Sequence, residues 1–280
     1  MIIALETSGA VGSVALWSGE AVLGSRSFDT QQEAVRRLPP AVRELLAVAG
    51  EAATAHRRDA GATGSAGATG TAVRGLAVSR GPGSFNGLRV GVALAKALAH
   101  AWRVPVAGIA TPLVWAAETA ARFPGRPVAV LQPSRREYVY LTIVESGKWN
   151  VERGEGEGEV ECGTWNVERG EGMVVSGTKG PPGVLRGPEI VAVESLGEVL
   201  AEAPDAPVLT GDWADLEEWS AQQGGFLLDT AKGASPSAET VARLAGWALG
   251  QAAADSYYIL RPEYVSPSQA ERNWGVNLGL

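Results

Sequence analysis

The 280-residue chain contains few of the side chains that build disulfides and metal sites. It has one cysteine, Cys162, and two histidines, His56 and His100. A single cysteine excludes an intramolecular disulfide and is typical of a reducing compartment. Three such residues also exclude a Cys/His zinc site unless carboxylates supply the remaining ligands. GxSxG and HExxH motifs are missing as well, which argues against serine hydrolases and zinc peptidases built on them.

Long hydrophobic runs are missing too. The most apolar stretch, Val90–Trp102, is interrupted by Lys96 and is shorter than the roughly 20 residues that span a bilayer. The opening residues Met1–Glu6 lack the basic start of a signal peptide. With 45% hydrophobic residues and a mean hydropathy of +0.02, the composition is that of a globular protein. We therefore expect a cytoplasmic protein that makes no membrane contact.

Glycine and proline are abundant instead, with 36 and 16 residues. Much of the glycine lies in a low-complexity Gly/Ala insertion at about 56–72 and in a duplicated segment at about 149–173, where WNVERGEG occurs twice. The duplication predicts a hairpin extension or a loop that tolerates insertion. We expect an N-terminal lobe at 1–110, a smaller lobe at 111–235, and a C-terminal helix and tail at 236–280.

Charge is distributed unevenly along the chain. Residues 1–140 hold 15 Lys and Arg against 9 Asp and Glu, whereas residues 141–280 hold 9 against 22. A basic first half could face an acidic partner or RNA, but arginines that coat a solvated face are the simpler explanation. The charge pattern alone leaves both interpretations open.

The order of expected elements indicates an α/β fold. Short turns join strands at Ile2–Glu6, Ser13–Trp17 and Ala21–Phe28, which predicts an antiparallel meander. Helices at Val35–Ala49, Phe85–His100 and Thr111–Phe123 then alternate with strands at Val73–Ser79 and Val104–Ile109. A meander followed by alternating helices and strands is typical of a ribonuclease-H-like sheet covered by helices. The Pro39-Pro40 pair is expected to kink or restart the first helix.

Two turns are candidates for binding phosphate. A Gly-Pro-Gly turn leads into a helix that Ser84 is expected to cap, and the N–H groups at such a helix start attract anions. The turn after the first strand offers a carboxylate and two hydroxyls. The candidate residues are Glu6, Thr7, Ser8, Gly81, Gly83 and Ser84. The alternatives are a tight strand-to-helix connection and an ordinary hairpin loop.

The helix after the Gly-Pro-Gly turn is apolar on nearly all sides. Gly87, Gly91, Ala95 and Ala99 recur every four residues and form a face of small side chains. Such a helix is buried either in its own domain or against another subunit. On the second interpretation, the predicted interface comprises Val35, Leu38, Val42, Leu45, Leu88, Gly91, Val92, Ala95 and Ala99.

These motifs resemble those of a known family. The run Gly81–Gly91 (GPGSFNGLRVG) is similar to the signature of the TsaB (YeaZ-type) subunits of the bacterial tRNA threonylcarbamoyladenosine machinery. Ala4–Ser8, Gly12–Trp17 and Arg37-Leu38-Pro39 are similar to that family's first hairpin and first helix. The chain departs from the family pattern at Gln132, which stands where the family has Asp.

The resemblance implies a fold of two ribonuclease-H-like lobes of the actin/Hsp70/sugar-kinase (ASKHA) superfamily, the second lobe reduced. It also implies a non-catalytic dimerisation subunit that pairs with a catalytic TsaD-type subunit and supports threonylcarbamoyl transfer to the adenosine next to the anticodon. A TsaE-type ATPase joins the complex, which reaches tRNA indirectly and uses ATP or ADP with Mg. The chain alone is expected to hold no cofactor or metal and to form a homodimer.

The residues leave two other functions to weigh. A small-molecule kinase of the same superfamily needs an acidic phosphate residue in each lobe, for which Glu6 and the Gly211-Asp212 pair are the candidates. A peptidase needs a nucleophile or metal cluster, and the sequence offers neither.

Overall fold

The computed structural model describes residues 1–59, 73–145, 148–150, 155–157, 183–203, 205–230, 235–250 and 257–265. The chain divides into two compact units, the first made of 1–80, 84–109 and 236–261 and the second of 81–83, 110–235 and 262–280. The C-terminal helix therefore belongs to the first unit, whereas the sequence analysis gave residues 236–280 a segment of their own.

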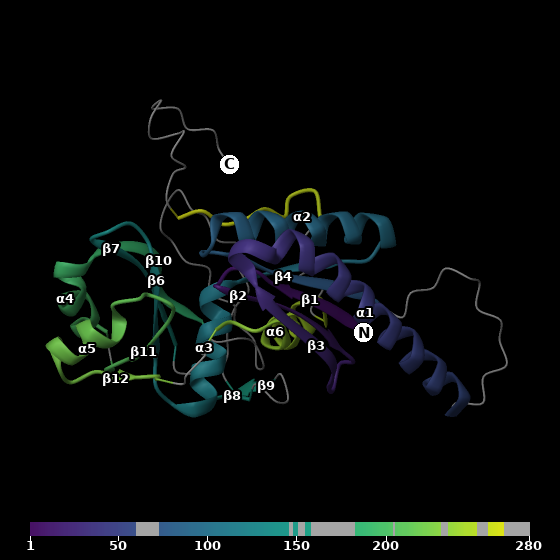
Figure 1. Ribbon diagram of the computed structural model, residues 1–280. Helices are drawn as coiled ribbons and strands as arrows, with labels where there is room; N and C mark the ends of the chain where they lie inside the picture. The colour runs from purple at the N-terminus through teal and green to yellow at the C-terminus, as the bar shows by residue number, and fades with distance from the viewer. Residues whose placement is uncertain are drawn as a thin grey trace. The chain divides into compact units, whose positions relative to one another are not determined.

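A five-stranded mixed sheet forms the centre of the first unit (Figure 1). Its strands lie in the order β3-β2-β1-β4-β5, with β1–β2 and β2–β3 antiparallel and β1–β4 parallel. The bounds are Ile2–Glu6 (β1), Val11–Trp17 (β2), Val22–Asp29 (β3), Gly75–Gly81 (β4) and Val106–Ala110 (β5). The predicted meander is confirmed.

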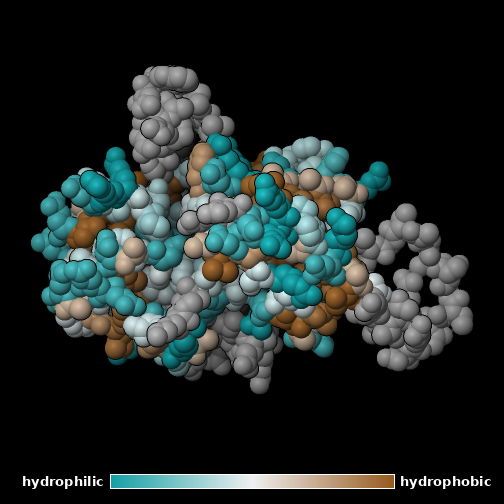
Figure 2. Space-filling view, viewed as in Figure 1, coloured by the Kyte–Doolittle hydropathy of each residue, from teal (hydrophilic) through white to brown (hydrophobic). Residues whose placement is uncertain are grey.

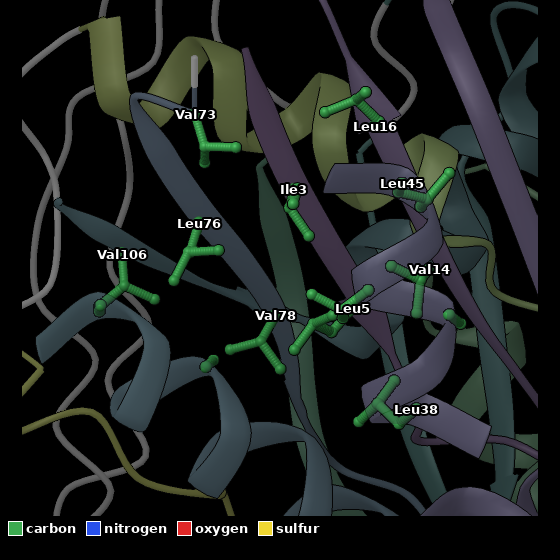
Figure 3. Close-up of a cluster of buried hydrophobic side chains, with 14 of the residues drawn as sticks. Ile3, Leu5, Val14, Leu16, Leu38, Leu45, Val73, Leu76, Val78 and Val106 are labelled. Atoms are coloured by element: carbon green, nitrogen blue, oxygen red, sulfur yellow. The ribbon is translucent and has the colours of Figure 1, made fainter. Parts of the chain in front are cut away.

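Two helices, α1 (Thr30–Asp59) and α2 (Phe85–Trp102), pack on one face of this sheet. The strands alternate, so Ile3 and Leu5 of β1 point to the same side as Leu76 and Val78 of β4 and meet Leu38 and Leu45 of α1 (Figure 3). α1 is continuous through Pro39-Pro40, so the helix does not restart there, and the kink stays a prediction. Both prolines are exposed, and water can therefore bond the carbonyls that lose a helical donor.

The other face of the sheet is covered by α6 (Ala238–Gly250). Three fully buried alanines stand in register across the neighbouring strands, where Ala4 pairs with Ala15 and with Ala77. These small side chains let the helix approach closely. The Ala238 N–H donates to Ser13 Oγ at 2.9 Å, and a Cβ on Gly246 would lie 2.1 Å from the Trp17 ring.

The second unit repeats this topology. Its sheet has the order β10-β7-β6-β11-β12, again with an antiparallel meander next to a parallel pair. α3 covers one face through Trp115, and α4 and α5 cover the other through Leu200 and Trp219. The bounds are Thr111–Arg122 (α3), Val128–Pro133 (β6), Tyr138–Val144 (β7), Val184–Ala192 (β10), Leu196–Ala201 (α4, after a 3-10 turn at Val193–Ser195), Val208–Thr210 (β11), Leu216–Gln223 (α5) and Leu227–Leu228 (β12).

Two sheets of one topology, each covered by helices on both faces, are the ASKHA-like fold that the sequence analysis expected. The second lobe keeps all five strands, and its reduction lies in the shortness of β11 and β12. The first copy of the duplicated segment contributes the antiparallel strands β8 (Lys148–Asn150) and β9 (Glu155–Glu157). The second copy, Cys162 and most of the Gly/Ala insertion lie outside the described residues. No helix in the described ranges combines the length and hydrophobicity needed to cross a bilayer.

Candidate functional site

The residues predicted to contact a partner lie mainly inside the first unit. Val35 is 69% exposed, but the other eight are buried: Leu38, Val42, Leu45, Leu88, Gly91, Val92, Ala95 and Ala99. The prediction is therefore wrong for those eight. An apolar helix can be covered by its own domain as well as by a subunit, and here α1 and the sheet cover α2.

The small-residue face of α2 has an intramolecular role. A Cβ on Gly87 would lie 2.0 Å from the Thr7 carbonyl oxygen, and a Cβ on Gly91 would lie 2.2 Å from Thr7 Oγ1. The glycines thus let the start of α2 rest directly on the turn that follows β1. This contact accounts for Gly87 and Gly91, while Ala95 and Ala99 pack in the core of the first unit.

The turn after β1 is closed by its own side chains. Glu6 Oε1 accepts hydrogen bonds from the Ser8 N–H at 2.6 Å and from Ser8 Oγ at 2.5 Å. The Ser84 N–H donates to the Ser8 carbonyl at 2.6 Å, and Ser84 Oγ accepts from the Gly87 N–H, which confirms Ser84 as the cap of α2. Glu6, Thr7 and Ser8 are all buried. These bonds engage Glu6 Oε1 and Ser8, whereas Thr7 Oγ1 has no hydrogen-bond partner among the described residues.

Gly81 and Gly83 belong to the second unit, on either side of Pro82. The Pro82 carbonyl accepts a hydrogen bond from Gln132 Nε2 at 3.0 Å, and Gln132 is 1% exposed. An aspartate at position 132 has no N–H to donate, so glutamine has a structural role at this departure from the family pattern. The assignment of the six candidate residues to a phosphate site stays a prediction. No three His, Cys, Asp or Glu among the described residues gather closely enough to hold a metal.

The exposed face of the two helices is different from the predicted one. On α2 the exposed residues Phe85, Arg89, Ala93 and Ala97 also recur every four residues, offset by two from the glycine and alanine face and so about 200° around the helix. The Arg89 guanidinium lies 3.8 Å from the centre of the Phe85 ring.

On α1 the exposed residues include Val35, Arg36, Arg37 and Arg43, with Arg37 paired to Glu33 at 2.9 Å; Pro39, Pro40, Glu44, Ala47 and Gly50 are exposed too. Figure 2 shows hydrophobic surface interspersed with hydrophilic groups over these helices. The α1–α2 face, meaning these exposed residues of both helices, is thus basic and partly apolar.

Comparisons with known proteins bear on this site. The family model described as "TsaD: tRNA N6-adenosine threonylcarbamoyltransferase" matches residues 60–165. The chain is 30% identical over 159 residues to the tRNA threonylcarbamoyladenosine biosynthesis protein TsaB of Escherichia coli K12, a match that spans 55% of this chain and 60% of that relative.

Two solved structures from Pseudomonas aeruginosa share the fold over nearly their full length. YeaZ superposes with a TM-score of 0.58 at 24% identity over 94% of this chain and 98% of its own. An uncharacterized protein with similarity to peptidase YeaZ gives 0.57 at 26% identity over 95% and 99%. These comparisons support a TsaB/YeaZ-type protein.

One further acid, Asp212, is partly buried and has one carboxylate oxygen that water does not reach. Asp212 follows Gly211, whose φ of +130° and contact with strand β6 require glycine, since a Cβ would lie 1.9 Å from the Leu131 carbonyl oxygen. Asp212 Oδ1 is buried and accepts no hydrogen bond from the described residues. Burial raises the pKa of Asp212 to about 6.

We expect Asp212 to make the wild-type chain less stable above pH 6 than at acidic pH. The variant Asp212→Asn is expected to lack this loss of stability. Because the folded state holds the Asp212 proton more tightly than the unfolded chain, this group destabilises the fold progressively from about pH 4 to pH 6 and fully above it. A shift of this size amounts to roughly 3 kcal/mol at most. Urea unfolding at several pH values checks the difference between wild type and variant, and a difference that is the same at pH 4.5 and pH 8 contradicts the assignment.

Proposed function

We propose that this chain is the non-catalytic, activating subunit of a tRNA threonylcarbamoyladenosine synthesis complex and pairs with a TsaD-type catalytic subunit. Similarity to TsaB supports the pathway, because that relative's name places it in this biosynthesis. The match to the TsaD model supports common descent with the partner subunit. A TsaE-type ATPase, ATP or ADP with Mg, and tRNA act at the level of the complex, and the chain pairs with itself when TsaD is missing.

The non-catalytic role is supported by what the chain can offer as ligands. The resemblance implies that TsaD-type subunits hold a metal through an HxxxH pair on a helix. The only histidines here, His56 and His100, cannot supply such a pair. The kinase alternative gains no support, since Glu6 and Ser8 bond each other.

The observation that carries the pairing proposal is the α1–α2 face. Val35 at 69% and Phe85 at 42% exposure are large apolar side chains in water, and arginines flank both. Interfaces are enriched in aromatic residues and arginine at their centre, with a polar rim. A partner that buries Val35, Phe85 and Ala93 and places carboxylates opposite Arg36 and Arg89 would match this face in shape and charge.

We expect Val35→Glu and Ala93→Glu to abolish pairing while leaving the chain folded. Each puts a carboxylate at an exposed position, so the free chain tolerates it, but the complex must desolvate it. Co-elution with the TsaD-type subunit on a sizing column measures pairing, and tRNA modification with TsaD and TsaE measures function. About 2 kcal/mol of lost binding energy corresponds to roughly a thirtyfold weaker complex.

A matched control is Leu185→Glu on β10, because Leu185 is 48% exposed but lies in the second unit. This variant is expected to pair and to support modification like wild type. Failure of the wild-type chain to co-elute with any TsaD-type subunit, or full pairing by Val35→Glu, overturns the proposal.

A further inference from the structure

A hollow of about 570 Å³ lies in the second unit, whereas the α1–α2 face belongs to the first. Its walls come from the start of β7, the end of β10 and the segment from Trp213 to Gln222. Because β6 and β11 are parallel and β7 runs back from β6, these segments meet at the carboxyl edge of the parallel pair. In open α/β sheets this edge is where ligands bind.

One wall of the hollow is aromatic. Trp213 lies 6.1 Å from Trp219, centre to centre, and Trp219 stacks on Phe226 at 5.9 Å. Trp219 is buried, whereas Trp213 and Tyr138 are partly exposed and line the opening. The wall is therefore fixed from behind and presents indole surface to an incoming group.

The rest of the lining is acidic. Glu137, Glu194, Asp215 and Glu218 contribute carboxylates against the single guanidinium of Arg136. Within the described part of the chain, none of these five residues forms an ion pair. Four carboxylates against one guanidinium leave an excess of negative charge around the aromatic wall, which favours a cationic occupant.

We propose that this hollow docks an arginine side chain carried by a basic segment of a partner protein. A guanidinium stacks flat on indole, is weakly hydrated and bonds two carboxylate oxygens at once, whereas a lysine ammonium does none of these equally well. The chain itself shows such stacking, where Arg135 lies 4.7 Å from the centre of the Tyr138 ring. The volume exceeds what one guanidinium fills, so residues flanking the arginine also enter.

Isothermal titration of the whole chain with a blocked Gly-Arg-Gly-Arg-Gly peptide tests the proposal. Lysine and glutamine versions of the peptide and free arginine amide serve as comparisons. We expect saturable binding of the arginine peptide, about fivefold weaker binding of the lysine peptide, and no binding of the glutamine peptide. Affinity is also expected to fall as salt rises.

Two neighbouring glutamates on α5 provide a matched pair of variants. Glu218 lines the hollow and Glu217 does not, although both are exposed. Glu218→Gln is expected to weaken the arginine peptide at least about fivefold, since it removes a charge-assisted bond, while Glu217→Gln binds like wild type. Trp213→Leu, checked for folding by its melting temperature, is expected to remove the preference for arginine over lysine.

Three results overturn the proposal. The first is that no peptide binds. The second is that arginine and lysine peptides bind equally and Glu218→Gln changes neither, which indicates diffuse surface charge. The third is that free arginine amide binds as tightly as the peptide, which indicates a site for a small cation and not for a protein segment.

Discussion

Alanine at position 87 is expected to unfold the first unit or to reduce its stability by more than about 3 kcal/mol. The new Cβ would lie 2.0 Å from the Thr7 carbonyl oxygen, 3.1 Å from Thr30 Cγ2 and 3.2 Å from Ser84 Oγ. A backbone oxygen at the end of β1 cannot move without shifting the strand. The gain in helix propensity, about 1 kcal/mol for replacing glycine by alanine, is too small to offset this clash.

Gly91→Ala tests the same contact through a side chain. The new Cβ at position 91 would lie 2.2 Å from Thr7 Oγ1 and 3.3 Å from Thr7 Cβ. Thr7→Ala removes the oxygen, so the double variant is expected to recover most of the stability that Gly91→Ala loses. Thr7→Ala is not expected to rescue Gly87→Ala, because the Thr7 carbonyl remains. Urea unfolding followed by circular dichroism measures Gly87→Ala, Gly91→Ala and the two double variants that combine each of them with Thr7→Ala.

The control is the same substitution where the helix faces water. Gly50 lies in α1, is exposed, and its Cβ position has no atom within 4 Å. Gly50→Ala is therefore expected to stabilise the first unit by up to about 1 kcal/mol. Equal losses for Gly50→Ala and Gly87→Ala, or rescue of Gly87→Ala by Thr7→Ala, would contradict the proposed packing of α2 on the β1 turn.

Alternation and turn chemistry were enough to predict most of the first sheet. Ile2–Glu6 was predicted with its observed bounds, and the Ser84 cap and the start of α2 at Phe85 followed from local hydrogen-bonding preferences. In the second unit α5 and β12 were missed. α5 has eight residues and buries only Leu216, Trp219 and Ser220, so its periodicity is weak, and β12 has only two residues.

The candidate site was harder to predict because burial depends on what covers a surface. The sequence shows that α2 has a small-residue face and a bulky face, but it does not show that Thr7, 80 residues upstream of Gly87, fills the space above the glycines. The signal that marks the exposed face was present in the spacing of Phe85, Arg89, Ala93 and Ala97. An aromatic residue and an arginine one turn apart on an otherwise apolar helix indicate which side faces water.

Helix α3 is joined to the end of β12 by a buried acid. Asp229, whose side chain is 2% exposed, accepts a hydrogen bond from Thr119 Oγ1 at 2.8 Å and from Arg122 Nε at 3.0 Å, and a further one from Arg122 Nη2. The Arg122 side chain is 40% exposed. The two partners of this ion pair therefore differ in their access to water.

This asymmetry predicts that removing the arginine is worse than removing the acid. Arg122→Ala leaves the buried Asp229 carboxylate without its arginine partner, and we expect a loss of roughly 3 kcal/mol or more in the free energy of unfolding. Asp229→Ala leaves an arginine that water can solvate and one buried hydroxyl. We therefore expect a smaller loss, about 1–2 kcal/mol in the free energy of unfolding, because water screens the charge of the exposed Arg122 side chain.

The decisive variant combines both changes. The double variant Arg122→Ala, Asp229→Asn removes the buried charge, while the amide oxygen at position 229 still accepts a hydrogen bond from Thr119. This double variant is therefore expected to be more stable than Arg122→Ala alone. Denaturant unfolding of the three variants measures the order, with Arg126→Ala as the control, because Arg126 is exposed and forms no ion pair with the described residues. If Asp229→Ala proves more destabilising than Arg122→Ala, the loss comes from the Thr119 hydroxyl and the local packing, and the buried carboxylate is not what Arg122 neutralises.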